Sequence, residues 1–288
     1  MPRNVGGERL DRFLSRALAV PLERARALVE AGRVRIRGKA CSPLRKLFGG
    51  EEIALDRPPP TPAAAVGPEL RLLYDDADCL VIDKPAGLPV EPSSPRGASV
   101  ASAARRLGRF DVGGCSTPGF PHRLDRDTTG ALLLARHDRA LAALRDGFQR
   151  GAVEKRYLAL VAGAPPERGR LDTPYARDPA DPRRFTTRSP SARRARLSWR
   201  VEARLEGAAL LSVDLETGRT HQIRVQLAEA GWGVLGDAVY GQPSPAIGRQ
   251  ALHAHRLAFT RPADGGRVEV VAPIPPDLAG AIEQLRRK

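Results

Sequence analysis

A proline-rich segment near residue 60 most constrains how this chain can fold. Residues 58–62 read Pro-Pro-Pro-Thr-Pro, and three alanines follow. Proline has a fixed φ and no backbone N–H, so a segment this dense in proline cannot enter a helix interior or the middle of a sheet. We therefore predict an extended linker at 58–68, which divides the 288-residue chain into a small unit at 1–57 and a large unit at 69–288.

The small unit has the pattern of a compact α/β domain. Apolar residues between positions 10 and 18 recur at the spacing of one helical face, and a second amphipathic helix is expected to end at Gly32. In 33–37 arginines alternate with aliphatic residues, which predicts a strand with one apolar and one cationic face. A last strand is expected at Glu51–Leu55.

The large unit mixes strands and helices without a regular alternation. The apolar runs predict strands at 79–82, 131–135, 157–162, 210–215 and 268–271, and amphipathic patterns predict helices at 138–151 and 221–229. Because strands outnumber helices and come in runs, we expect an α+β fold with a mixed, largely antiparallel sheet. Residues 177–204 hold nine arginines, three acids and several prolines, which predicts a basic loop or hairpin.

Charge and cysteine content narrow the functional classes. The formal net charge is +14, and the first 57 residues carry 13 Lys and Arg against 7 Asp and Glu, which favours a polyanionic partner. No run approaches the roughly 18 apolar residues of a membrane span, and the N-terminus lacks the apolar core of an export signal. Cys41, Cys79 and Cys115 form no CxxC pair, so a reducing cytoplasm is expected rather than a disulfide framework or a zinc ribbon.

The densest polar cluster is His122–Gly130, which reads HRLDRDTTG and runs directly into an apolar strand. Neighbouring arginines favour the ionised form of a carboxylate, which suits Asp125 to act as a nucleophile or a base rather than an acid. The alternative is a turn in which Asp127 and Thr128 bond the local backbone while Asp125 makes surface ion pairs. From composition alone the turn is favoured.

A second cluster is Glu216–Arg224, which reads ETGRTHQIR. Gly218 permits a tight turn, and Thr220 can cap the helix that follows. Arg219 and Arg224 flank the start of that helix, and a helix N-terminus beside arginines suits a phosphate or a carboxylate. The alternative, favoured from this segment alone, is an ordinary capped helix with a cationic first turn.

Three further segments carry polar residues in short motifs. Lys84–Val90 is a loop with proline and glycine after a strand, for which a structural turn is the default interpretation. Lys155–Tyr157 places basic residues beside an aromatic ring, which can stack on a base or begin a strand. His253 and His255 would share one face of a strand, but no matching carboxylate or cysteine spacing favours a metal site. The sequence contains no GxGxxG, P-loop, HExxH or GxSxG motif.

In order and spacing, these segments resemble the pseudouridine synthases of the RluA type over about residues 69–276. The central motif of that family, HRLDxxTxG, matches within Pro121–Gly130, and KPAGLPV, KRYLALV, TGRTHQIR and GDAVYG fall in register. The small unit resembles the S-four RNA-binding domain through RLDRFL and EAGRVRIRGK. Glu91 departs from the pattern, because many family members have His at that position.

The resemblance implies a role for each matching residue. The catalytic carboxylate of HRLD is Asp125, the tyrosine that lies against the target uracil is Tyr157, and the arginine that pairs with the catalytic Asp is Arg224. Arg123 would help to hold the place and phosphate of a flipped nucleotide. The other implied substrate contacts are His122, Lys84, Arg219 and His221. The implied RNA-binding residues of the small unit are Arg24, Arg33, Arg35 and Lys39.

The resemblance also implies a reaction and its partners. A synthase of this type breaks the N-glycosidic bond of a uridine in RNA, rotates the uracil and rejoins it through carbon 5, after the base has left its stack. This isomerisation needs no cofactor and no metal, and we expect a monomer with no membrane partner. Large-subunit ribosomal RNA is the favoured substrate, because an N-terminal S-four domain is typical of that branch. Transfer RNA as substrate, a non-catalytic RNA-binding protein, and a nucleoside hydrolase are the alternatives.

Overall fold

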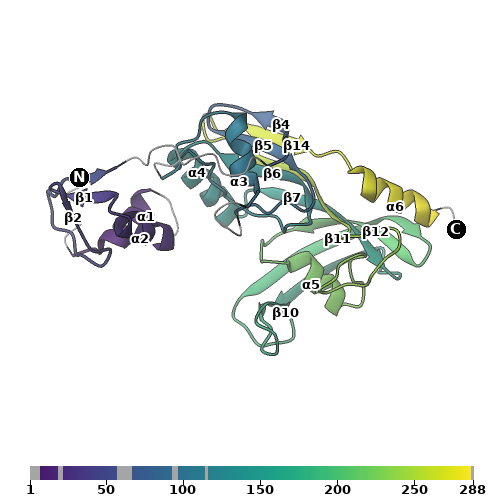
Figure 1. Ribbon diagram of the computed structural model, residues 1–288. Coiled ribbons are helices and arrows are strands. Elements are labelled where there is room, and N and C mark those ends of the chain that lie inside the picture. The colour runs from purple at the N-terminus through teal and green to yellow at the C-terminus, as the bar shows by residue number, and fades with distance from the viewer. Residues whose placement is uncertain (1–6, 19–21, 57–66, 93–96, 114–115, 287–288) are drawn as a thin grey trace.

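The structure is a computed structural model, and it describes the chain except for residues 1–6, 19–21, 57–66, 93–96, 114–115 and 287–288 (Figure 1). The side chains of residues 23, 24 and 27 also lie outside the described part. The helices are α1 (Leu10–Ala17), α2 (Leu22–Glu30), α3 (Val100–Ala103), α4 (Asp138–Gln149), α5 (Gln222–Glu229) and α6 (Pro276–Arg286), with a 3₁₀ turn at Ala104–Leu107. The strands are β1 (Val34–Ile36), β2 (Lys39–Ala40), β3 (Ile53–Leu55), β4 (Arg71–Asp75), β5 (Cys79–Lys84), β6 (Thr129–Ala135), β7 (Glu154–Ala162), β8 (Arg168–Pro174), β9 (Ala176–Arg177), β10 (Phe185–Thr186), β11 (Arg194–Leu205), β12 (Ala208–Leu215), β13 (Leu252–Thr260) and β14 (Arg267–Val271).

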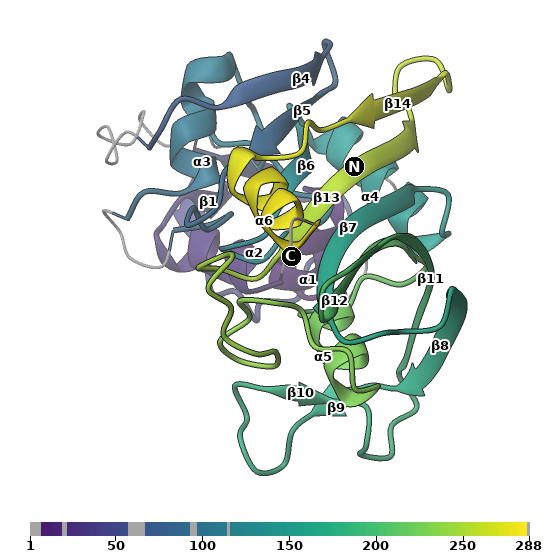
Figure 2. The ribbon, with the colours of Figure 1, turned by 90° about the vertical axis from the view of Figure 1, so that its right-hand side faces the viewer.

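A nine-stranded sheet forms the centre of the large unit. Its strands follow the order β4-β5-β6-β13-β7-β12-β11-β8, with β14 paired to β13, and Figure 2 shows the sheet curving between its two edges. Every pairing between described strands of this sheet is antiparallel except that of β6 with β13. The predicted α+β fold with a mixed, largely antiparallel sheet is confirmed.

Strand β6 is buried on both faces, which explains its uninterrupted apolar sequence. Successive side chains of a strand point to opposite faces. Leu132 and Leu134 therefore enter the main core, which α6 also joins, while Leu133 enters a second core that contains residues of α4. The strand begins at Thr129, two residues before the predicted 131–135. This buried strand anchors the end of the HRLD segment.

Residues 7–56 have a sheet and an apolar core of their own. The strand order is β2-β1-β3, and α1 and α2 contribute to the same core as β1. Arg35 is exposed between buried Val34 and Ile36, as the alternating pattern predicted. Strand β3 begins at Ile53 rather than at the predicted position 51. The linker prediction falls mostly on residues outside the described part, so the division of the chain there stays a prediction.

The prediction of a basic loop or hairpin over 177–204 is wrong for its second half. Residues 194–205 form β11, the longest strand of the sheet, and only the first half contains the short β9–β10 hairpin. Ala195, Leu197 and Trp199 are buried on β11, while Arg194, Arg196 and Arg200 belong to the alternate positions that point outward. The many arginines hid a period-two pattern that marks a half-buried strand.

Gly130 is the residue that lets β6 lie beside β13. Its φ is +107°, and a Cβ built there would lie 2.3 Å from the carbonyl oxygen of Ala254 on the neighbouring strand. We expect Gly130→Ala to lower the free energy of unfolding by about 3 kcal/mol or more, because it adds a backbone clash to a left-handed conformation. Chemical denaturation measures this loss.

Gly280 offers the matched control, because it lies within α6 and a Cβ there would meet nothing within 4 Å. We expect Gly280→Ala to be neutral or to stabilise the protein by up to about 1 kcal/mol, since alanine is the better helix former. Equal stability changes in the two variants would contradict the steric role of Gly130.

Candidate active site

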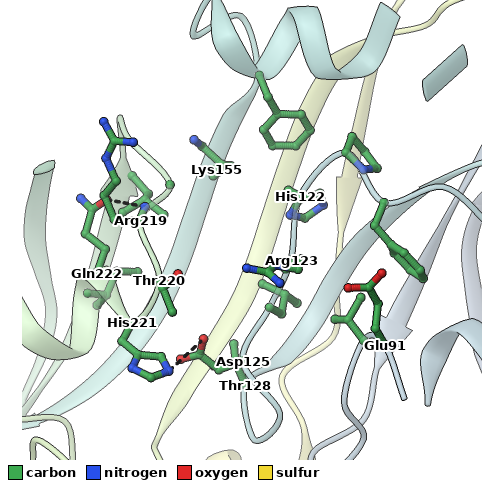
Figure 3. Close-up of a pocket in the computed structure, with 18 of the residues that line it drawn as sticks. Glu91, His122, Arg123, Asp125, Thr128, Lys155, Arg219, Thr220, His221 and Gln222 are labelled. Atoms are coloured by element: carbon green, nitrogen blue, oxygen red, sulfur yellow. Dashed lines mark hydrogen bonds and ion pairs between the residues drawn. The ribbon is translucent and has the colours of Figure 1, made fainter. Parts of the chain in front are cut away.

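One cavity of about 1050 Å³ collects most of the residues singled out from the sequence (Figure 3). Its walls come from the loop after β5, the segment 118–128 before β6, strand β7, and the segment 215–224 that leads into α5. The predicted site residues among its lining are His122, Arg123, Asp125, Tyr157, Arg219, His221 and Arg224. Glu91 lines it as well. The fold thus joins four separate motifs at one place.

Asp125 lies in the turn that leads into β6, and its carboxylate faces the cavity. Its backbone carbonyl accepts a hydrogen bond from the N–H of Thr128 at 3.2 Å, which closes the turn. The hydroxyl of Thr128 accepts from the Gln250 amide at 2.7 Å and so ties the turn to the segment before β13. The side chain of Asp125 is 22% exposed and pairs with Arg224. The local turn and the functional cluster, which the sequence left as alternatives, therefore occur together.

Arg224 holds two carboxylates with one planar guanidinium. Its Nη1 donates to Asp125 Oδ2 at 2.8 Å, while its Nε and Nη2 donate to the two oxygens of Asp237 at 2.6 and 2.8 Å. Burial by itself would lower the pKa of Arg224, but the bonds to Asp237 and the charge of Asp125 outweigh it and raise that pKa. Arg224 therefore stays charged and fixes the Asp125 carboxylate in place.

Asp237 is a site residue to which the sequence reasoning assigned no role. Its side chain is fully buried and also accepts hydrogen bonds from the backbone N–H groups of Val239 and Tyr240. Burial alone would raise its pKa, but the bonds from Arg224 and the two amides hold that pKa below its usual range. The signal in the sequence was the GDAVYG motif, in which Asp237 is the only charged residue.

Tyr157 comes from the middle of β7 and closes another side of the cavity. The residue is 7% exposed, and its burial, together with the negative charge of Asp125, raises its pKa. The phenol is therefore neutral at ordinary pH. A neutral aromatic face beside a carboxylate can receive a planar base and leave the carboxylate free to act on it.

His221 immediately precedes α5, with its backbone in the left-handed region at φ +59°. Its Nδ1 lies 3.0 Å from the Tyr240 hydroxyl and its Nε2 lies 3.9 Å from Asp125 Oδ1. Burial lowers the pKa of His221, although the charge of Asp125 opposes this effect. The prediction that Thr220 caps this helix is wrong, because no side chain makes that bond and the residue at the cap position is His221.

Known proteins match both the sequence and this arrangement of motifs. A family model described as RNA pseudouridylate synthase matches residues 78–229. Over 99% of its length, the chain is 42% identical to a protein of Chloroflexus aurantiacus named "Uncharacterized RNA pseudouridine synthase", of which it covers 92%. This chain belongs to the RNA pseudouridine synthase family. It is accordingly an isomerase that modifies RNA.

Further relatives fit the same assignment. The synthase is 34% identical to "Ribosomal large subunit pseudouridine synthase D" of Zymomonas mobilis over 94% of its own length and 92% of that protein. Among solved structures, human RNA pseudouridylate synthase domain containing 1 superposes with a TM-score of 0.60 at 25% identity, over 74% of this chain and 87% of that one. These relatives support the resemblance to the RluA type, whereas the S-four assignment of the small unit stays a prediction.

His122, Arg123 and Arg219 line the cavity of the synthase but differ in burial and charge. The ring of His122 stacks on Phe148 at 4.8 Å and accepts a hydrogen bond from the N–H of Leu133. Burial, together with the charge of Lys155, lowers the pKa of His122 to about 3, so its ring is neutral. Arg123 and Arg219 are exposed at the cavity wall and can reach an entering RNA.

Lys84 is not among the residues that line the cavity. Its side chain is fully buried, and its ammonium donates to the carbonyls of Pro85, Leu88 and Arg126 at 2.7 to 2.8 Å. Burial lowers its pKa to about 8, although the charges of Asp127 and Asp125 oppose this. The predicted direct contact of Lys84 with substrate therefore does not fit its position. Lys84 instead joins the KPAGLPV loop to the turn that contains Asp125.

The implied RNA-binding residues of the small unit lie outside the cavity lining. Arg35 and Lys39 are exposed, and Arg33 is half-buried. The Nε of Arg35 lies 3.7 Å from Oδ2 of Asp56. The side chain of Arg24 lies outside the described part of the structure.

The histidine pair at 253 and 255 lies on β13, away from the cavity lining. His253 bonds the hydroxyl of Thr129, and His255 bonds the carbonyl of Ala272. Among the described residues, no three His, Cys, Asp or Glu side chains group closely enough to hold a metal ion. Within the same residues, none of the helices has the length and apolar character of a membrane span.

Proposed function

We propose that this synthase converts uridine to pseudouridine in large-subunit ribosomal RNA, with Asp125 as its catalytic carboxylate. The observation that carries the proposal is the ion pair of Asp125 with Arg224 at 2.8 Å, in a cavity that Tyr157 also lines. Relatives from three organisms that are named ribosomal large subunit pseudouridine synthase D, at 32–34% identity, support the choice of RNA.

The geometry suits an isomerisation in which a single carboxylate acts on a base held out of the RNA stack. A uracil that enters beside Asp125 would lie against Tyr157, while the hydrogen bond from Arg224 keeps the carboxylate in position. The bond between uracil nitrogen 1 and ribose carbon 1′ breaks, and a bond between uracil carbon 5 and carbon 1′ forms. The hydrogen on carbon 5 is lost to solvent, and nitrogen 1 takes up a proton. Asp125 would attack the base, attack the anomeric carbon, or remove a ribose proton to give a glycal.

Release of tritium from uridine labelled at carbon 5 tests the proposed reaction. We expect the full chain to release tritium from an unmodified large-subunit ribosomal RNA transcript and not from bulk transfer RNA. Release from transfer RNA alone would move the substrate to the other class. Tight RNA binding without release from either RNA would favour the non-catalytic alternative.

We also propose that the small unit is an RNA-binding domain of the S-four kind. Its exposed cations include Arg35 on strand β1 and Lys39 on the neighbouring strand β2. We expect deletion of residues 1–62 to weaken RNA binding and to flatten its dependence on salt, because fewer phosphates would be neutralised. The remaining unit should keep its cooperative unfolding transition. Loss of that transition would place the domain boundary elsewhere.

A further inference from the structure

Lys155 is a buried cation that the reaction described above does not use. It lies on β7 with 9% of its surface exposed, and it contributes to the wall of the cavity (Figure 3). Its ammonium nitrogen lies 5.7 Å from the centre of the Phe148 ring. A cation over a ring face gains some stabilisation, and the ammonium stays accessible from the cavity.

No described carboxylate compensates the charge of Lys155. Its neighbours along β7 belong to other pairs, since Glu154 binds Arg267 at 2.9 Å and Arg156 binds Asp214 at 2.7 Å. Burial lowers the pKa of Lys155, and no nearby acid opposes that effect. Lys84 differs, because three backbone carbonyls satisfy its ammonium. The fold therefore keeps the Lys155 cation in the cavity wall without a carboxylate partner among the described residues.

The position of Lys155 relative to the catalytic cluster is fixed by the strand. Lys155 and Tyr157 are two residues apart on β7, so they share a face at a separation of about 7 Å. The charge of Lys155 helps to lower the pKa of His122, whose ring is neutral. A nucleotide whose base enters beside Tyr157 would bring its sugar–phosphate backbone to the wall that contains Lys155.

We propose that Lys155 binds a backbone phosphate of the RNA next to the target nucleotide. An ammonium is a compact point charge suited to a phosphate oxygen, and a partly buried pair of this kind is less screened by salt than a surface contact. This assignment rests on the proposed RNA substrate, and it gives that substrate a further point of attachment besides the uracil. Binding of the phosphate would offset the cost of burying the cation.

The substitution Lys155→Met tests the assignment, because it removes the charge and keeps the length of the side chain. With an unmodified large-subunit ribosomal RNA transcript, we expect about 10-fold weaker binding near 0.1 M salt and a slope of log K against log salt that is shallower by about one. KM should rise while kcat changes little, since a phosphate contact is made equally in the ground and transition states. The melting temperature should stay the same or rise, because a buried charge is removed.

Arg156→Met is the matched control. It removes the same charge from the adjacent residue, which is half-exposed and paired with Asp214 on the other face of β7. We expect this variant to retain the wild-type salt slope. An unchanged affinity and slope in Lys155→Met would overturn the assignment, as would an equal change in both variants. A raised KM with an unchanged slope would also overturn it, because the contact would then be to an uncharged group.

The binding measurement separates this proposal from the proposed reaction. If the wild-type chain released no tritium but its RNA affinity still depended on Lys155, the reaction would be wrong and the phosphate site would stand. If tritium were released with full affinity in Lys155→Met, the reaction would stand and the phosphate site would be wrong.

Discussion

Asp125→Asn is expected to reduce tritium release from uridine-labelled RNA by about 10⁴-fold, which is the scale of loss when a group that acts directly on substrate is removed. The amide has nearly the same shape but cannot act as an anionic nucleophile or base. Arg224 would keep both bonds to Asp237 in the variant, so its position and the fold should persist. The assay compares single-turnover release by the two proteins, with circular dichroism as the check on folding.

Asp127→Asn provides the control for this prediction. Asp127 lies in the same loop, two residues away, but is not among the residues that line the cavity. We expect its substitution to change release by no more than about 3-fold, in line with a residue outside the reacting group. Similar losses in the two variants would show that the loop needs acidic residues in general, and would contradict the specific role of Asp125.

Asp237→Asn is expected to lower the free energy of unfolding by about 3–5 kcal/mol, the usual cost of breaking a buried ion pair by removing one partner. The guanidinium of Arg224 is 6% exposed, so the loss of Asp237 leaves a buried positive charge with Asp125 as its one remaining carboxylate. Arg224 would then be held less firmly, and tritium release should fall as well. Urea denaturation and the tritium assay measure the two effects on the same protein.

The exposed pair of Arg256 with Glu269 gives the comparison, because it has the same fork geometry on the protein surface. Exposed pairs contribute little to stability, so Glu269→Gln should leave both the melting temperature and the activity close to wild type. A stability loss in Glu269→Gln as large as that in Asp237→Asn would show that burial is not what makes the Asp237 pair important.

The pH dependence of stability gives an independent measure of the same pair. The pKa of Asp237 is held below its ordinary value of 3.8, so the folded protein binds the proton less readily than the unfolded chain does. The pair therefore contributes its full stability above about pH 4 and loses it as the pH falls through the lowered pKa. We expect the stability of the wild type to fall more steeply below pH 4 than that of Asp237→Asn.

Much of the fold could be predicted because local pattern and burial agree. Strand β6 reads as an apolar run since it is covered on both faces, and α4 reads as an amphipathic helix since one face meets the core. Strand β11 was not predicted, because its four arginines are as many as its buried residues and made the segment look like a basic loop. Helix α6 was also not predicted, although Leu278 and Ile282 pack into the main core.

The sequence by itself determined the motifs, their order, and the identity of Asp125, Tyr157 and Arg224 as the residues to examine, because the family resemblance is carried by residue types at fixed spacings. It could not place Lys84. The motif assigned this residue to substrate binding, but the fold buries its side chain under a loop. It could not find the second carboxylate, Asp237, since a side chain 13 residues from Arg224 meets it only after α5 and the following loop have packed. The distances between these side chains arise from the packing of segments that are far apart in the chain, and so does the burial that shifts their pKa values. Only the tertiary structure decided them.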